Sequence, residues 1–401
     1  MNRLMKTFLI LTLLLIGSGL LISPVSAASE NVTTIRYAAN NYSYAERSVT
    51  RTWTEMQSLY PNVDSKGPVY MQGPTFDSAD PYGTAGQNMI LYYGHNGTYV
   101  RNLTDLVDGM AAGDEIFVKA TDGMIRYFNY TNVYEPYNDG TYSQGNMVLA
   151  WWDSVSGTVP GYSEGIRLFF YTPPESYGVA DSLNFTLVEM RDSLAPWYRY
   201  NYSGIWPSSK GLSVKYVNQL KIFPPHRHDF NTTGDTTGWA YKGDVSSDPP
   251  ATIDVPGTPI SSTSTIADDD TTLEQYGSTT LRAGHRFNFS IDTATDKDGP
   301  VNKIESLSIT WNGMGYKDGS GADGLTLYIW NSTGFESLSS TSLDSEVTLS
   351  GTRSSNIENY VNSGNITILA LQKTAGSGTF AKSWIKTDYA KLVVTHHHSN
   401  M

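Results

Sequence analysis

The second half of the chain alternates apolar and polar residues with a period of two. Phe287, Phe289 and Ile291 share one face of residues 285–291. Strict alternation over a few residues, bounded by Gly, Asn, Asp or Ser, is typical of strands with one buried face. The same pattern recurs at residues 304–311, 325–330, 366–371 and 389–394. We therefore expect residues 239–395 to form an antiparallel β-sandwich.

The first half mixes this period with the helical one. Residues 53–60 carry apolar side chains at helical spacing and stop at Pro61, and residues 103–110 repeat at i, i+3, i+4 and i+7. Both spacings predict helices. Asp122-Gly123 predicts a tight turn in a hairpin. Strands are expected at residues 115–120, 125–129, 147–152, 166–171 and 213–222. Residues 31–223 are thus predicted to be an α+β domain with a mixed sheet.

Pro224 and Pro225 lack backbone donors and favour extended neighbours, so residues 224–238 are predicted to be a linker. His226, His228 and Asp229 follow and are candidate metal ligands. So short a pattern favours exposed or interface histidines instead. Residues 396–401 begin with three histidines. They are expected to be a disordered tail or tag remnant rather than a weak metal site.

The N-terminus has the features of a secretory signal. Arg3 and Lys6 precede an apolar run at residues 8–16, and Val25-Ser26-Ala27 is a small-residue cleavage site. Residues 1–27 are therefore expected to be a cleaved signal peptide rather than an uncleaved anchor, because glycine and serine interrupt the apolar run. No further apolar span follows, so we expect a secreted protein without a transmembrane anchor.

Composition excludes several kinds of chemistry. The 401 residues contain no cysteine, which rules out disulfides, zinc thiolates, iron–sulfur clusters and a thiol nucleophile. The net charge of −12 argues against a nucleic-acid partner. His95, His226, His228 and His285 are the candidate bases, but no catalytic motif surrounds them. We expect no catalytic residue and no bound cofactor.

Potential N-glycosylation sites are the strongest signal. Chance would place roughly five Asn-x-Ser/Thr sequons in a chain of this composition, and the sequence has about twice that number. A preference of Asn and Thr for turns is the alternative explanation. We favour glycosylation, because the signal peptide and the missing cysteines also indicate an extracellular protein. The sequons lie at Asn31, Asn41, Asn96, Asn102, Asn129, Asn184, Asn201, Asn231, Asn288, Asn331 and Asn365.

Two further features are candidate binding sites. Acidic residues cluster in the second half of the chain. They could bind calcium or form ordinary solvated turns, and their irregular spacing favours turns. The candidate calcium ligands are Asp268, Asp270, Asp292, Asp296 and Asp298. Trp151 and Trp152 are candidates for an aromatic surface on which a sugar ring could stack. Adjacent strand residues face opposite ways, so at most one of them joins it and the other is expected in the core.

Several motifs carry a resemblance to a known family. Gly97-Thr98-Tyr99-Val100 precedes the predicted helix, Gly113-Asp114-Glu115 precedes a strand, and Thr121-Asp122-Gly123-Met124 follows it. Gly165-Ile166-Arg167-Leu168 and Ser213-Val214-Lys215-Tyr216-Val217 complete the order. Residues 90–222 thereby resemble the sulfite-oxidase-type molybdopterin-binding domain. That family holds its metal through a cysteine, which this chain lacks, so the resemblance implies a degenerate scaffold and transfers no catalytic residue.

The composition resembles that of secreted archaeal surface proteins of the methanogen type, and the second half resembles jelly-roll modules that bind sugars. We therefore expect a secreted, N-glycosylated cell-surface protein with a structural role in a sheath, surface layer or filament, or an adhesive role. Its expected partners are copies of itself or other envelope proteins, and glycans. One alternative is a carbohydrate-binding protein acting through the sandwich. A second is a cofactor-dependent oxidoreductase on the N-terminal domain.

Overall fold

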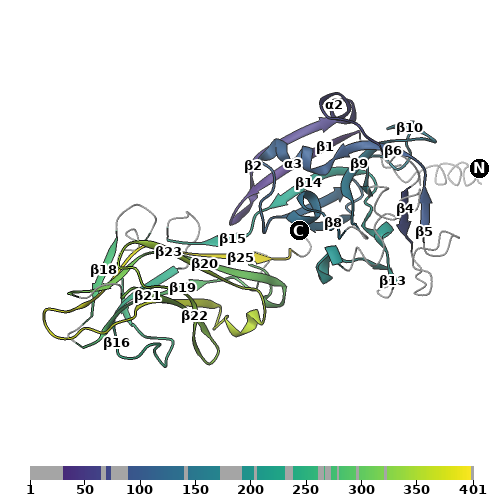
Figure 1. The fold of residues 1–401 in the computed structure, drawn as a ribbon. Helices are drawn as coiled ribbons and strands as arrows, with labels where there is room; N and C mark the ends of the chain where they lie inside the picture. Colours follow the sequence, from purple (N-terminus) through teal and green to yellow (C-terminus); the bar gives the residue numbers. More distant parts are fainter. Residues whose placement is uncertain are drawn as a thin grey trace, which may run out of the picture. The chain divides into compact units, whose positions relative to one another are not determined.

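The fold is mostly β-strand, as Figure 1 shows for the computed structural model. The structure describes residues 30–398, apart from the segments 65–68, 74–88, 140–142, 172–191, 203–205, 231–237, 261–265, 267–271, 278–279, 295–297 and 320–322. The predicted signal peptide, residues 1–27, lies outside the described residues.

The chain divides into two compact units, with the main boundary between Ile222 and Phe223. The first unit contains the described residues up to Arg36 together with Arg47–Met110 and Ile116–Ile222. The second contains the chain from Phe223 onward and two short segments from earlier in the sequence, Tyr37–Glu46 and Ala111–Glu115.

Two sheets dominate the first unit. One has the strand order β2-β1-β14-β7-β8, with β1 parallel to β14, so it is a mixed sheet. The other has the order β10-β9-β6-β3, with β11 also paired to β9. Their strands are β1 (Asn31–Ala38), β2 (Asn41–Thr52), β3 (Val63–Asp64), β6 (His95–Tyr99), β7 (Glu115–Ala120), β8 (Ile125–Asn129), β9 (Asn146–Asp153), β10 (Gly157–Thr158), β11 (Arg167–Tyr171) and β14 (Val217–Phe223). Two-stranded ribbons are formed by β4 (Val69–Gln72) with β5 (Met89–Tyr92) and by β12 (Asn201–Tyr202) with β13 (Trp206–Pro207).

The helices are short. The first predicted helix is confirmed as α2 (Trp53–Leu59), which starts with a capping box between Thr52 and Glu55 and buries Met56. The others are α3 (Val100–Thr104), α4 (Tyr130–Tyr134) and the 3₁₀ turns η1 (Asp105–Val107), η3 (Pro196–Tyr198), η4 (Ser209–Leu212), η6 (Val301–Lys303) and η7 (Ile357–Asn359). Within the described part of the chain, no helix has the length and apolar character needed to cross a membrane.

The second predicted helix, residues 103–110, is wrong in extent. The apolar spacing there is produced by α3 followed by the tighter turn η1, and Asp108 at φ 72° ends the run. The hairpin of β7 and β8 forms at the predicted residues. The strand predicted from residue 213 begins only at Val217, because Tyr216 has a φ of 54°, which no strand residue adopts.

The second unit is built from two antiparallel sheets. One has the order β15-β25-β20-β23, with β18 also paired to β25, and the other has the order β17-β16-β19-β24-β21-β22. Their strands are β15 (His226–His228), β16 (Gly238–Val245), β17 (Thr258–Pro259), β18 (Leu273–Tyr276), β19 (Arg282–Ser290), β20 (Ile304–Lys317), β21 (Leu325–Asn331), β22 (Gly334–Thr341), β23 (Val347–Arg353), β24 (Asn365–Gln372) and β25 (Ser383–His396).

One hydrophobic core joins the inner faces of both sheets. Trp311 of β20 and Leu392 of β25 are buried with Phe287 of β19 and Ile368 of β24. Alternate residues of β20 are buried over most of its length, as the period-two pattern predicts. The arrangement is sandwich-like, and β20 and β25 are both longer than the predicted strands.

Parts of the predicted linker and tail, residues 226–228 and 396–398, belong to ordered structure. His226–His228 form β15, which pairs with Leu392, Val393 and Val394 of β25. His396 is the last residue of β25, and His397 and His398 are buried beyond it. The predicted linker segment therefore supplies a strand, and the histidines expected in a tail lie inside the unit.

Gly313 sits at an irregularity in the pairing of β20 with β25, where the register shifts between Asn312 and Gly313. A Cβ atom at this position would lie 2.1 Å from the carbonyl oxygen of Lys386 on the facing strand. Backbone cannot yield as a flexible side chain can, so glycine is required here.

We predict that Gly313→Ala lowers the free energy of unfolding of the second unit by about 1–3 kcal/mol, the usual cost of overpacking. Urea unfolding of the full chain, followed by circular dichroism, measures it. Gly334→Ala is the matched control, because a Cβ atom there meets nothing within 4 Å. Equal stability of the two variants would contradict the requirement.

Candidate functional site

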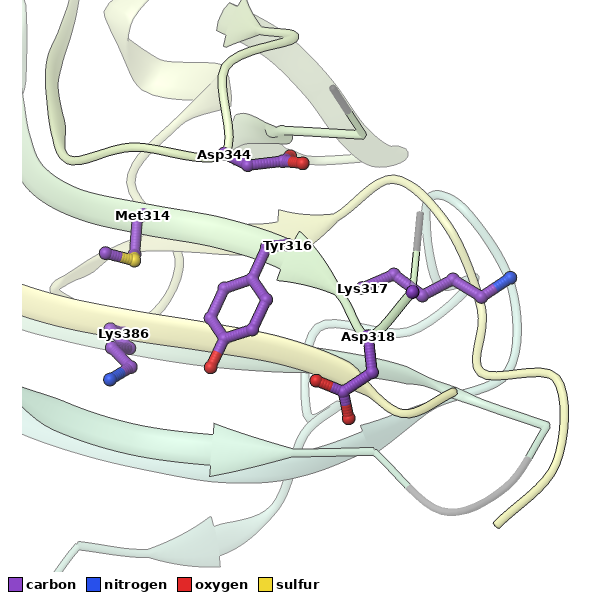
Figure 2. Close-up of a pocket in the computed structure, with 7 residues that line it drawn as sticks. Met314, Tyr316, Lys317, Asp318, Asp344 and Lys386 are labelled. Atoms are coloured by element: carbon purple, nitrogen blue, oxygen red, sulfur yellow. The ribbon is translucent and has the colours of Figure 1, made fainter. Parts of the chain in front are cut away.

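A cavity of about 530 Å³ opens on the outward face of the sheet that contains β20 and β25. Figure 2 shows the side chains around it. The end of β20 and the turn after it contribute most of the lining, β25 contributes a lysine, and the loop after β22 contributes an aspartate. The lining residues are Met314, Tyr316, Lys317, Asp318, Gly319, Asp344 and Lys386.

Strand alternation explains why these side chains meet. Met314 and Tyr316 are two residues apart on β20, and the residues between and before them turn inward. The antiparallel register sets Met314 opposite Lys386 and Tyr316 opposite Trp384. Directly opposed residues of an antiparallel pair lie within about 5.5 Å of each other, so the register brings the two aromatic rings together.

Tyr316 and Trp384 form a stacked aromatic pair. Their rings are parallel to within 2°, with centroids 5.8 Å apart. The indole Nε1 of Trp384 donates a hydrogen bond of 2.8 Å to Oδ2 of Asp318, which fixes the orientation of the indole. Both rings are only partly buried, so part of their surface stays in contact with solvent.

Charged groups surround the aromatic pair. Lys386 pairs with Glu274 of β18, and this contact raises the pKa of the lysine. Oδ1 of Asp344 accepts hydrogen bonds from the backbone N–H groups of Asp323 and Gly324, at 2.8 and 3.0 Å. In Figure 2 the Tyr316 ring lies between Lys386 and Asp318, with Asp344 on a separate segment.

Exposed apolar side chains lie on the loops beside the cavity. Leu343, which precedes the lining residue Asp344, is 57% exposed, and Phe380 is 93% exposed. The loop that carries Phe380 is tied to the cavity, because the N–H of Asp318 donates to the carbonyl of Lys382. These exposed side chains extend the apolar surface at this end of the sheet.

Of the five candidate calcium ligands, only Asp292 and Asp298 lie within the described residues. Asp268, Asp270 and Asp296 lie outside the described residues. Oδ1 of Asp298 lies 2.8 Å from Nε2 of His228, and its Oδ2 accepts the backbone N–H of Asp292 at 2.5 Å. Among the residues that the structure describes, no three His, Asp or Glu side chains form a group that could hold a metal ion. Calcium is bound by oxygen ligands, whereas the carboxylate of Asp298 contacts a histidine nitrogen.

Asp298 instead belongs to a buried histidine–carboxylate cluster in the second unit. His226 and His228 of β15 contact Asp298, whereas His397 and His398 both place Nδ1 on Glu115, at 2.5 and 2.7 Å. The ring of His396 bridges the two groups, with its centroid 5.4 Å from that of His226 and 4.3 Å from that of His398.

The candidate bases are buried rather than exposed to a substrate. Burial and then the charge of Arg167 lower the pKa of His95 to about 4. Burial and then the charge of Lys242 lower the pKa of His285 to about 3. Burial also lowers the pKa of His226. At neutral pH these three imidazoles are therefore held neutral inside the protein.

The two adjacent tryptophans divide as expected. Trp151 is buried in the core of the first unit, where its Nε1 donates to Thr98, and Trp152 is half-buried. The aromatic pair at the cavity was not predicted. The signal was present in the sequence, because Tyr316 and Trp384 occupy polar-face positions of alternating strands, but pairing them required the register of β20 with β25.

The sequon asparagines differ in exposure. Asn31, Asn41 and Asn201 are exposed. Asn184 and Asn231 lie outside the described residues. The other six, Asn96, Asn102, Asn129, Asn288, Asn331 and Asn365, are half-buried.

Comparison with known proteins identifies a family match within the second unit. Residues 235–396 match a family model described as the C-terminal domain of an uncharacterized protein. The match covers β16 to β25, ends at the last residue of β25 and leaves β15 outside. No curated protein matches the chain.

We predict that protein isolated from its natural source carries a glycan on Asn41, because the asparagine and the serine of that sequon are both exposed. Mass spectrometry of intact glycopeptides tests this. Asn41→Gln should remove the mass of one glycan. An unmodified peptide at Asn41, and likewise at Asn31 and Asn201, would contradict the glycosylation prediction.

Proposed function

We propose that this chain is a secreted, N-glycosylated and non-catalytic surface protein whose second unit binds saccharides at the cavity beside Tyr316 and Trp384, and so acts as an adhesive module. The observation that carries the proposal is the parallel pair of aromatic rings on the outward face of the sheet, bordered by carboxylates and lysines.

The aromatic pair supplies the apolar part of such a site. One face of a pyranose ring presents mainly C–H groups, which pack on an aromatic surface while the hydroxyls stay at the edge. The stacked pair offers a fixed aromatic surface at little cost in conformational entropy, because the two rings hold each other in place. The cavity volume of about 530 Å³ lies in the range of roughly 300–1,000 Å³ that is common for small-molecule sites.

The charged groups supply the polar part. Asp318 and Asp344 offer carboxylate oxygens that accept from sugar hydroxyls, and Lys386 donates to hydroxyl or acidic oxygens. Hydrogen bonds to charged groups are about twice as strong as neutral ones, and several of them around a ring select hydroxyl orientation. An apolar platform bordered by a few fixed polar groups is the pattern expected of a carbohydrate site.

The proposal also includes the fold family of each unit and the place of the protein in a cell. The mixed sheet of the first unit and the order β6, α3, β7, β8 support a degenerate molybdopterin-domain-like scaffold for residues 90–222. The two packed sheets of the second unit support a jelly-roll-like sandwich. The composition and the sequons support a place in an archaeal cell envelope, with envelope glycans or glycoproteins as partners.

We predict that the full chain binds a subset of saccharides on a glycan array and that Trp384→Ala weakens the best interaction at least tenfold, or by about 1.4 kcal/mol. Tyr316→Ala should act in the same direction. Trp384→Phe should be intermediate, because it keeps a ring but loses the hydrogen bond to Asp318.

The matched control is Trp239→Ala, which removes a tryptophan that is 52% exposed on β16 of the other sheet. It should bind as the unmodified chain does, and circular dichroism should show that all variants are folded. No saturable binding to any saccharide would contradict the proposal, and so would equal losses in Trp239→Ala and Trp384→Ala.

A further inference from the structure

We propose that the histidine–carboxylate cluster is a latch that holds β15 against the end of β25 at neutral pH and releases it in acid. The cluster consists of His226, His228, His396, His397, His398, Asp298 and Glu115. The inference goes beyond saccharide binding and does not depend on it.

The first argument is burial. His226, His228, His396 and His398 are 1–3% exposed, Asp298 is fully buried and Glu115 is 2% exposed. Protonation would place further charge in a space that water does not reach, and an ion is costly there unless it is paired. His226 shares Asp298 with His228, so a proton taken up by His226 adds positive charge beside a carboxylate that a second imidazole already contacts.

The second argument is packing. The rings contact one another, with His396 between His226 and His398, and the Tyr42 ring lies edge-on to both His226 and His398. Gly299, at φ 72°, leaves room for this arrangement, since a Cβ atom there would lie 2.5 Å from the ring of His396. Like charges at such separations repel strongly inside a protein.

The third argument is the surrounding charge. Burial alone would raise the pKa of Asp298, but contacts with His226 and His228 outweigh it and hold the carboxyl well below its usual range. The pKa of Glu115 is lowered for the same reason by His397 and His398. Both acids are therefore anions at neutral pH. The other titratable or charged groups that face the cluster from the elements packed against it are Tyr42, Asp114, Arg227, Asp229, Asp292 and Lys303.

The sign of the pH effect follows. The pKa of His226 is lower in the folded protein than in the unfolded chain, so opening takes up a proton. The stability that the latch provides is complete above the unfolded value of about 6.5 and falls as the pH drops below it. For each proton taken up, the open population rises about tenfold per pH unit within this window.

The latch and the saccharide site are far apart. Trp384 and His396 are separated by twelve residues on β25, which at about 3.3 Å per residue is roughly 40 Å. Variants of the latch should therefore leave saccharide binding unchanged, so a failure of one proposal is distinguishable from a failure of the other.

Hydrogen exchange of the full chain, measured by mass spectrometry at pH 6.5 and 5.5 and corrected for intrinsic rates, tests the latch. Peptides covering residues 223–230 and 390–398 should lose about fivefold or more in protection at the lower pH, the change expected for one proton taken up. Peptides from residues 283–289 should not, because His285 has a pKa of about 3 and stays neutral at both pH values. Equal loss in all peptides, or no loss in the first two, would overturn the proposal.

A double variant, His226→Asn with His228→Gln, replaces the two rings that contact Asp298 by neutral hydrogen-bonding side chains and should reduce the pH effect to within about twofold. His285→Gln is the control and should keep the full effect. If the double variant does not fold, NMR titration of the imidazoles in the unmodified chain decides. The ring of His226 must then titrate below 6.5, and titration at or above that value would overturn the latch.

Discussion

The antiparallel pairing of β20 with β25 is the constraint on which the described features of the second unit depend. It extends from Lys317 opposite Ser383 to Ile304 opposite His396. The inward side chains of this ladder, such as Trp311 and Leu392, form the hydrophobic core with the opposite sheet. The outward residues at one end make the aromatic pair, and the last residue at the other end enters the histidine cluster. A one-residue slip would turn Trp384 inward and would separate it from Tyr316.

The two ends of this ladder differ in how far water reaches their polar side chains. At the Trp384 end, polar and aromatic side chains share a surface that water reaches, so their polar groups cost little to keep available for a ligand. At the His396 end, imidazoles and carboxylates are buried and must satisfy one another. The first arrangement suits reversible binding, and the second makes stability sensitive to proton concentration.

The sequence predicted the parts of this structure that depend on local pattern. Period-two alternation located the strands around Phe287 and Trp330, and the helical spacing of apolar residues 53–60 located α2. It failed where the decisive contact is remote. Residues 226–228 read as linker because two prolines precede them, yet they pair with β25, more than 160 residues later. The final histidines were predicted to be a disordered tail, because no local pattern indicates that they contact Glu115.

The difference between local pattern and remote contact also explains which parts of the candidate site could be predicted. Asp298 looked like a calcium ligand because it stands in an acidic loop with a glycine, and only the folded chain places it against His226 and His228. Tyr316 and Trp384 lie outside the strands predicted at residues 304–311 and 389–394, and their pairing depends on a register that no local spacing specifies. The sequence shows residue types and their periodicity, whereas it does not show which residues distant along the chain contact each other.

The most direct test of the central claim is to map by NMR which residues of the full chain change when a saccharide identified on the array is titrated in. The account predicts that the largest chemical-shift changes fall on the indole N–H of Trp384 and on the backbone of residues 314–319 and 386. Saturable changes confined to other parts of the chain, with the Trp384 indole signal unmoved, would contradict it.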